Sequence, residues 1–242
     1  MKKMLSMMLI MASIVCLFSC SSDDEEERPN IPTNRYMKVG ESFDLGYESN
    51  WVSSNTFSVA VDNSGVVSGV RKGTANVYSR DKNLSCYISV SPSYTLYDEP
   101  ITNWSTSKSS VLSEKGEPDS DGETTISYYT NSSVAPIEMY LFENGCLKAS
   151  AIAVKTSCSE ELVKHLSQRF KAVGVDTNNY NFSFMDAESL SDAKTVVVGQ
   201  LYNITYWLVM YMPNTNTRSA NSDSKLFEAI LSNFKLNGDI LE

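Results

Sequence analysis

Histidine is almost absent from this chain of 242 residues, because His165 is the only one. A Ser-His-Asp triad would have to use that residue, and no Gly-x-Ser-x-Gly motif or glycine-rich phosphate loop accompanies it. These absences argue against nucleophilic hydrolysis and nucleotide binding, so we expect a protein that is not an enzyme and has no cofactor. His165 itself lies at the border of a helical apolar face, where we expect an ordinary surface position.

Long apolar runs are also lacking. The run at residues 4–18 is shorter than the roughly 20 apolar residues that a comfortable membrane span needs. With Lys2 and Lys3 before it, residues 1–19 have the basic start and short apolar region of a secretory signal peptide. We therefore expect this segment to be absent from the mature chain.

The apolar run ends in Leu17-Phe18-Ser19-Cys20, which resembles the lipobox of bacterial lipoproteins. The resemblance implies a diacylglycerol on the Cys20 thiol, cleavage before Cys20 and acylation of the freed amine. Several acyl chains make a lasting anchor, where a single chain would be marginal. The expected partner is thus a membrane, which holds the chain through a lipidated tether at residues 20–30.

An acidic run in that tether resembles the export signal of Bacteroidota-type surface lipoproteins. The resemblance implies display on the outer face of the outer membrane. The other interpretation is an extended, self-repelling tether, because adjacent acids cannot pair locally, and both interpretations can hold. The run consists of Asp23, Asp24, Glu25, Glu26 and Glu27.

Positive charge and cysteine are both in short supply. The net charge of −9 becomes −11 when Lys2 and Lys3 leave with the leader, so nucleic-acid binding is not expected. Cys86, Cys146 and Cys158 remain beside the lipidated cysteine, and an odd number permits at most one internal disulfide. Their spacing matches no zinc motif, and we expect buried, unpaired thiols.

Residues 31–92 consist of short β-like runs separated by turns. The apolar, β-branched run at 56–61 is followed by Asp62-Asn63-Ser64-Gly65, a turn whose residues tolerate positive φ. No helical period of useful length interrupts the pattern, which predicts a small β-sandwich. We expect Trp51 in the sandwich core; exposure for stacking on a glycan is the alternative.

Several segments of this region resemble the bacterial immunoglobulin-like domain of group 2. They are residues 39–41, 51–55, 59–62, 65–70 and 73–77. The resemblance implies an immunoglobulin-like fold and a role as a spacer or adhesive module. The connection between Leu45 and Trp51 is shorter than the family's loop, so no binding residues are carried over. Gly65 is expected in a hairpin turn, and Gly69 and Gly73 on either side of a tight connection.

Residues 96–242 have a mixed pattern in which one order of elements occurs twice, a helix and then three strands. The first set is a helix at 107–115 and strands at 124–129, 137–142 and 147–154; the second is a helix at 157–173 and strands at 180–185, 195–201 and 205–212. Glu143-Asn144-Gly145 predicts a hairpin. A helix at 224–234 follows. The predicted fold is multidomain: an all-β immunoglobulin-like sandwich, then a two-layer α+β domain of two repeats with a C-terminal helix.

This order of elements is similar to the tandem repeats of beta-lactamase inhibitor protein and of outer-membrane assembly lipoproteins. The likeness is in element order only, without a shared motif. It implies helices that cover one face of a joined antiparallel sheet.

Two sets of residues in this domain are candidates for binding. Asp119, Asp121 and Glu123 alternate in a loop and could present oxygens to calcium, although a complete twelve-residue loop is missing and a solvated acidic loop is the alternative. Trp207 and Tyr211 share one face of a strand. If that face is open, they could stack on a sugar or anchor a protein; packing inside the domain is the alternative.

The function predicted from these features is a surface-anchored lipoprotein that acts as a non-catalytic binding or adhesion module for a glycan or a protein. One alternative is an accessory lipoprotein of the cell envelope that scaffolds or inhibits a protein partner. A more distant alternative is a carboxylate-dependent glycosidase, for which two acids would have to meet in space.

Overall fold

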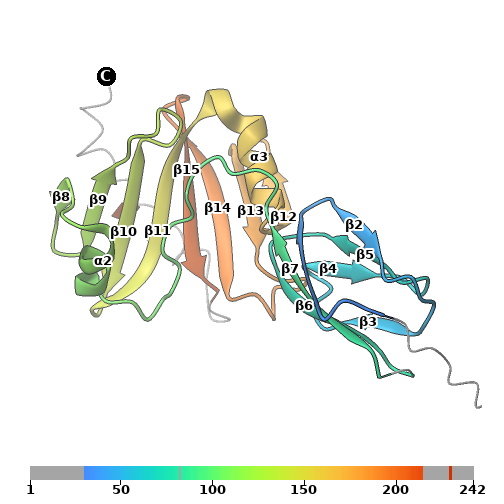
Figure 1. The fold of residues 1–242 in the computed structure, drawn as a ribbon. Coiled ribbons are helices and arrows are strands. Elements are labelled where there is room, and N and C mark those ends of the chain that lie inside the picture. Colours follow the sequence, from blue (N-terminus) through green and yellow to red (C-terminus); the bar gives the residue numbers. More distant parts are fainter. Residues whose placement is uncertain (1–29, 82, 215–228, 231–242) are drawn as a thin grey trace, which may run out of the picture. The chain divides into compact units, whose positions relative to one another are not determined.

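Three β-sheets make up most of the regular structure in this computed structural model, which describes residues 30–81, 83–214 and 229–230 (Figure 1). The described residues from Ile31 onward belong to one compact unit. Two α-helices occur among them, and neither is long and apolar enough to span a membrane. Cys20 and the acids at 23–27 lie outside the described residues. The predominance of strands agrees with the β-rich fold that the sequence predicts.

Two of the sheets pack around one shared core, as predicted for residues 31–92. One has the strand order β1-β7-β6-β3 and the other β2-β5-β4. Inward side chains alternate with outward ones along β6 and β7, and Trp51 is only 5% exposed in the core. The strands are β1 (Asn34–Lys38), β2 (Ser42–Asp44), β3 (Trp51–Ser53), β4 (Val59–Val61), β5 (Val66–Gly69), β6 (Gly73–Ser79) and β7 (Ser85–Ser91).

Glycine is required at two close approaches in this sandwich. Gly65 has a φ of +91°, and a Cβ there would lie 2.8 Å from the carbonyl oxygen of Tyr47, which accepts a hydrogen bond from the Trp51 indole. Gly73 has a φ of +148°, and a Cβ there would overlap Ser58 Oγ. The predicted roles of both glycines are therefore confirmed.

The third sheet contains eight strands in the order β12-β13-β14-β15-β11-β10-β9-β8. The sheet has two halves of four strands, and each half comes after a helix in the chain. The halves join where β11 pairs with β15. The first half comprises α2 (Lys108–Lys115), β8 (Ser120–Asp121), β9 (Thr125–Tyr129), β10 (Ile137–Glu143) and β11 (Cys146–Lys155). The second comprises the 3₁₀ turn η1 (Thr156–Cys158), α3 (Ser159–Ser167), β12 (Lys171–Asp176), β13 (Asn181–Met185), β14 (Thr195–Tyr202) and β15 (Tyr206–Pro213).

Each half therefore has four strands, where the sequence pattern predicted three. The short β8 was not predicted, and neither was β12, because the helix predicted to run to Val173 ends at Ser167. Phe170 and Val173 continue the helical spacing of apolar residues, which hid the change to an extended backbone. The predicted hairpin between β10 and β11 is confirmed, because Asn144 and Gly145 both have positive φ.

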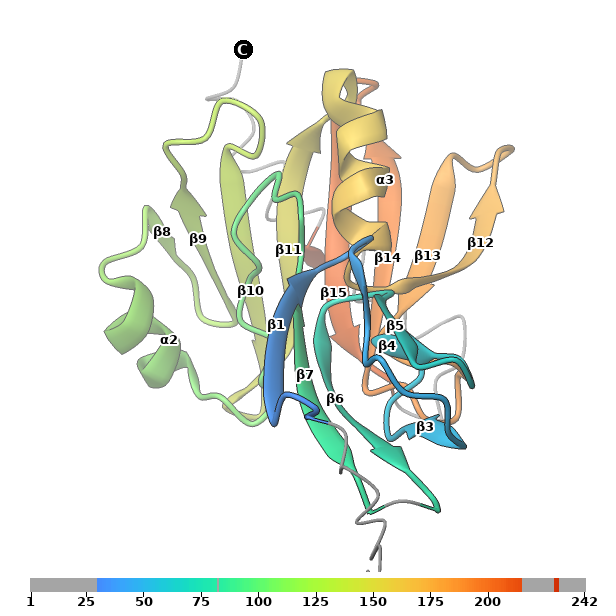
Figure 2. The ribbon, with the colours of Figure 1, turned by 45° about the vertical axis from the view of Figure 1, so that its right-hand side comes forward.

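One face of the eight-stranded sheet is covered by the helices and by the segment that precedes α2 (Figure 2). Leu162 and Leu166 of α3 pack on this face with Tyr97, and Val111 of α2 packs further along it. The opposite face carries small and apolar side chains such as Ala151 and Met210. Ile230, which is helical and 2% exposed, packs there. The rest of the helix predicted at 224–234 lies outside the described residues.

The three cysteines are all free, so no disulfide joins them. Cys86 is buried, as expected, but Cys146 is exposed and Cys158 is half-buried. Cys146 stands at the hairpin between β10 and β11, where a side chain at the end of the strand reaches solvent.

Candidate functional site

The aromatic pair predicted to bind a ligand lies beneath α3. Tyr211 is fully buried, and its hydroxyl shares a hydrogen bond of 2.8 Å with that of Tyr97. Trp207 is half-buried, donates from Nε1 to Ser159 Oγ at 2.8 Å, and packs beside Phe182. The two side chains do share a face, but α3 covers it. The prediction of an open stacking platform at Trp207 and Tyr211 is therefore wrong.

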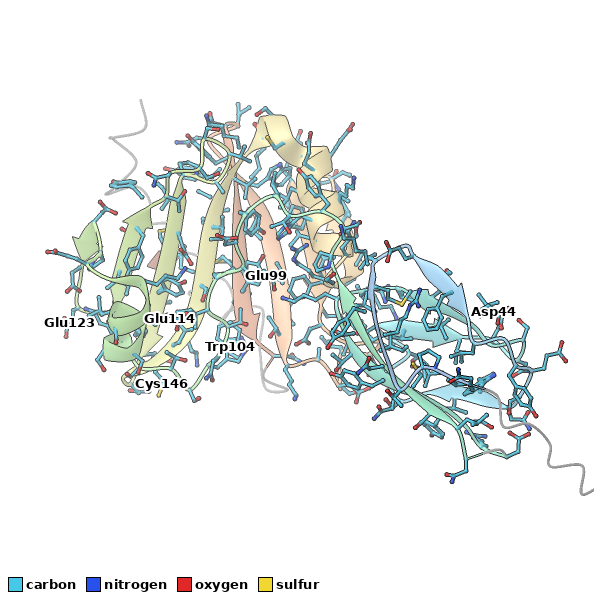
Figure 3. All side chains as sticks on the ribbon, in the orientation of Figure 1. Asp44, Glu99, Trp104, Glu114, Glu123 and Cys146 are labelled. Atoms are coloured by element: carbon cyan, nitrogen blue, oxygen red, sulfur yellow. The ribbon has the colours of Figure 1, made fainter. Side chains whose placement is uncertain are left out.

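The acidic residues proposed for calcium do not converge on one point. Asp119 Oδ2 accepts a hydrogen bond of 2.7 Å from the Tyr129 amide, and Asp121 pairs with Lys108 at 2.5 Å. Glu123, labelled in Figure 3, does not join Asp119 and Asp121 in a group of acids that could hold a metal ion. Within the described residues, no set of three histidine, cysteine or acidic side chains is arranged to hold a metal ion.

His165 is fully buried, which corrects the expectation of a surface position. Its Nδ1 accepts a hydrogen bond of 3.0 Å from the Leu96 amide, and its ring lies 4.2 Å from that of Tyr97. Burial, with the nearby charge of Arg169, lowers the pKa of His165 to about 3. The imidazole is therefore neutral at physiological pH, and the segment before α2 holds it in place.

The carboxylate of Glu99, labelled in Figure 3, fixes the C-terminal end of the segment that precedes α2. Its Oε1 accepts hydrogen bonds from Arg169 Nε at 2.8 Å and from Lys72 Nζ at 2.7 Å. Burial opposes ionisation of Glu99, but the hydrogen bonds and charges of Lys72 and Arg169 outweigh it and lower the pKa below its usual value. Lys72 also donates its amide to Gln168 O at 2.8 Å. At the other end, Gln168 Oε1 accepts hydrogen bonds from the amides of Ser93 and Tyr94 at 2.9 and 3.0 Å, so residues 93–99 are held at both ends.

This arrangement leaves a cleft between the segment before α2, the end of α2 and the loop that joins β9 to β10. We call it the α2 cleft; its volume is about 470 Å³, within the range of small-molecule sites. Its lining residues are Thr95, Leu96, Tyr97, Asp98, Lys115, Thr130, Asn131, Ser132, Ala135, Glu138 and Ile152.

An ion pair is built into the lining of the cleft. Lys115 Nζ lies 2.8 and 2.9 Å from the two carboxylate oxygens of Glu138. The buried hydroxyl of Tyr140 also donates to Glu138. Burial, with the nearby charge of Glu138, raises the pKa of Tyr140, so this phenol stays protonated and remains a donor. The Glu138 carboxylate is therefore held in place by two partners.

Other polar groups in the lining are open to a ligand. Asp98 and Asn131 are exposed, and neither side chain bonds to another described residue. Thr130 Oγ1 donates to the carbonyl of Ala135 and accepts from the Ser132 amide at 3.1 Å, which fixes the loop. The cleft thus offers a carboxylate, an amide and hydroxyls on a rigid frame, a set that suits a small hydroxyl-rich ligand.

No local pattern in the sequence predicts the residues of this cleft. They come from four segments that only the fold brings together, and none belongs to a recognisable motif. The polar run Asn131-Ser132-Ser133 between two strands was the one local signal. No family model matches the chain, and no curated protein matches its sequence. The case for a binding site therefore depends on this geometry.

Proposed function

We propose that this chain is a lipid-anchored bacterial surface protein that binds a small polar ligand, such as a saccharide, without cleaving it. The lipobox-like segment at Cys20 and the acidic run after it support the lipid anchor and the location on the cell surface. The segments quoted above support an immunoglobulin-like module of group 2. The helix-led halves of the eight-stranded sheet support a repeated α+β unit, each half carrying one strand more than its pattern suggested.

The α2 cleft is the observation that carries the binding function. It combines a suitable volume with exposed polar groups at Asp98 and Asn131. Its walls are fixed by hydrogen bonds and by the Lys115–Glu138 pair, so little order has to be gained on binding.

Two carboxylates, Asp98 and Glu138, line this cleft, as a glycosidase would require. A glycosidase also needs one carboxyl that is protonated near neutral pH. Glu138 does not suit that role, because its carboxylate oxygens are already bonded to Lys115 Nζ and to the Tyr140 hydroxyl. Binding without hydrolysis is therefore the function that the geometry supports best.

Asp98→Ala and Asn131→Ala are expected to weaken binding at the cleft at least tenfold each, a loss of about 1.4 kcal/mol, because each removes an exposed hydrogen-bonding group. The measurement is retention of the fluorescently labelled chain on a glycan array, followed by titration calorimetry with the best glycan. Glu114→Ala is the matched control, since Glu114 is exposed on α2 outside the cleft (Figure 3). Equal binding by all three variants and the parent would rule out the cleft.

A second candidate function, holding a protein partner in the cell envelope, is favoured by β12. This strand is at the edge of the eight-stranded sheet, and Val173 and Val175 on it are 53% and 75% exposed. Edge strands with exposed apolar residues can pair with another chain. Co-purification of a stoichiometric membrane complex that is lost in Val175→Lys would favour this function.

Surface display can be tested separately from binding. Replacing Asp23, Asp24, Glu25, Glu26 and Glu27 by alanine is expected to leave the protein membrane-bound but protected from protease added to intact cells. Immunoblotting after protease shaving measures this, and the unchanged chain should be degraded. If the alanine variant is degraded equally, the acidic run is only a tether.

A further inference from the structure

The outer face of the four-stranded sheet is open to solvent and rich in aromatic and polar side chains. Along β1, β6 and β7, buried residues such as Met37, Val77 and Ile88 point into the sandwich core. The residues between them point outward. The outward side chains are Asn34, Tyr36, Lys38, Thr74, Asn76, Tyr78, Ser85, Tyr87, Ser89 and Ser91.

Three tyrosines form a diagonal row across this face. The central tyrosine is Tyr87 on β7. Tyr36 on β1 is paired with Ser89, two residues after Tyr87 on β7. Tyr78 on β6 is paired with Ser85, two residues before Tyr87 on β7. From the usual spacing of strands and of residues along them, successive tyrosines are about 8 Å apart. The side chains of Tyr36, Tyr87 and Tyr78 are 77%, 43% and 37% exposed. We call this row the tyrosine strip.

The strip continues into a hollow in the surface. Val52 on β3 is opposite Tyr78 in the register, so it follows the last tyrosine on the same face. Together with Asn50, Trp51, Asn63 and Arg80, Val52 lines a hollow of about 350 Å³. The row of rings thus ends beside this hollow, because Val52 belongs both to the outer face and to the lining.

The charge of this face is unlike that of the rest of the protein. The chain contains 29 acidic residues, yet none of the outward residues on these strands is acidic. Lys38 follows Tyr36 at one end of the row, and Arg80 lines the hollow at the other end. A ligand along the strip would therefore meet Lys38 at one end and Arg80 at the other. The carboxylates of Glu41 and Asp81 lie beyond these strand ends, where they bond to the Lys38 amide and the Ser79 hydroxyl.

We propose that the tyrosine strip binds an extended acidic polysaccharide, a chain of sugars that includes uronic acids. The tyrosine rings would stack on the apolar faces of the sugars, and the hydroxyls and amides around them would bond to sugar hydroxyls. Lys38 and Arg80 would pair with carboxylates of the polymer. This site is separate from the α2 cleft and does not depend on it.

The composition of the face favours a glycan over a protein partner. A protein interface of useful affinity has an apolar, well-packed centre. Here the residues between the tyrosines are serine, threonine and asparagine, and Val52 at the end of the row is the one aliphatic residue near them.

Affinity electrophoresis of the full chain tests the proposal. Native gels would contain polygalacturonate or hyaluronan, and parallel gels the neutral polymers dextran or hydroxyethylcellulose. At least one acidic polymer is expected to slow the unchanged protein. Tyr36→Ala with Tyr87→Ala should raise the apparent Kd at least tenfold, and Lys38→Gln with Arg80→Gln should raise it severalfold. Tyr180→Ala is the matched control, because Tyr180 is 61% exposed outside this face, and its mobility should not change.

Urea unfolding of each variant separates loss of binding from loss of fold, and only variants with an unchanged midpoint are compared. Three results would overturn the proposal: no polymer slows the protein, Tyr180→Ala has the same effect as the double tyrosine variant, or neutral polymers slow it as much as acidic ones. Retardation that depends on Asp98 and not on the tyrosines would also overturn it, because it would move the site to the α2 cleft.

Discussion

Replacing Gly199 by alanine is expected to lower the free energy of unfolding by about 3 kcal/mol, the upper part of the range for overpacked cores. Gly199 on β14 pairs with Phe182 on β13, and a Cβ built on Gly199 would overlap the Phe182 ring. That ring cannot move aside easily, because it packs against Phe184 and Trp207 with centroids 5.8 and 5.2 Å away. The added methyl group must therefore displace part of the core beneath α3.

The measurement is urea unfolding followed by circular dichroism, with Gly174→Ala as the matched control. Gly174 is in β12 of the same sheet, and a Cβ there would find its nearest atom, Ser183 Oγ, at 3.9 Å. The control is expected to change the free energy of unfolding by less than about 0.5 kcal/mol. Equal losses for the two alanines would show that the Phe182 ring can shift to accept a methyl group on Gly199.

The chain is expected to lose stability in mildly acidic solution because of His165. Its pKa falls from 6.5 to about 3 in the folded state, so between these values the unfolded chain binds a proton that the folded chain does not. The contribution of neutral His165 is therefore complete above pH 6.5 and is lost as the pH falls toward 3. The slope approaches about 1.4 kcal/mol per pH unit in the steepest region.

The free energy of unfolding measured in urea at intervals from pH 7.5 to 5 checks this expectation. His165→Asn is the comparison, since asparagine can still accept from the Leu96 amide but does not titrate. We expect the variant to be less stable at pH 7 and its profile to be flatter. The depressed pKa of Glu99 adds a loss only below its usual 4.5, so the interval from 6.5 to 5 reports on His165. Parallel profiles would contradict the assignment.

Local patterns in the sequence predicted the strands and hairpins well, because turn residues and alternation act over a few positions. Asn144-Gly145 is where the hairpin occurs, and seven strands between β9 and β15 include six that the pattern located to within two residues. Two strands, β8 and β12, were not predicted, and the second contains Val173-Gly174-Val175, a β-branched pair around a glycine that disfavours a helix. The apolar spacing from Leu166 to Val173 obscured that signal.

Burial could not be predicted in the same way, because it depends on segments far apart in the chain. The sequence placed Trp207 and Tyr211 on one face correctly but could not show that α3 and Tyr97 cover it. It placed His165 at the border of an apolar face, and the segment before α2 then buried it. The α2 cleft and the tyrosine strip arise from the same long-range packing and register.

The joining of β11 to β15 also bears on how the eight-stranded sheet forms. The hairpins β10–β11 and β14–β15 close through short turns and need only local contacts. The pairing of Lys155 with Tyr206 and of Ser150 with Tyr211 instead brings together strands from opposite halves of the sheet. Because closing a long loop costs more entropy than closing a hairpin, two preformed halves should meet at this seam late in folding. Until they meet, the apolar faces on either side of the seam are incomplete, and this is when the chain is most prone to aggregate.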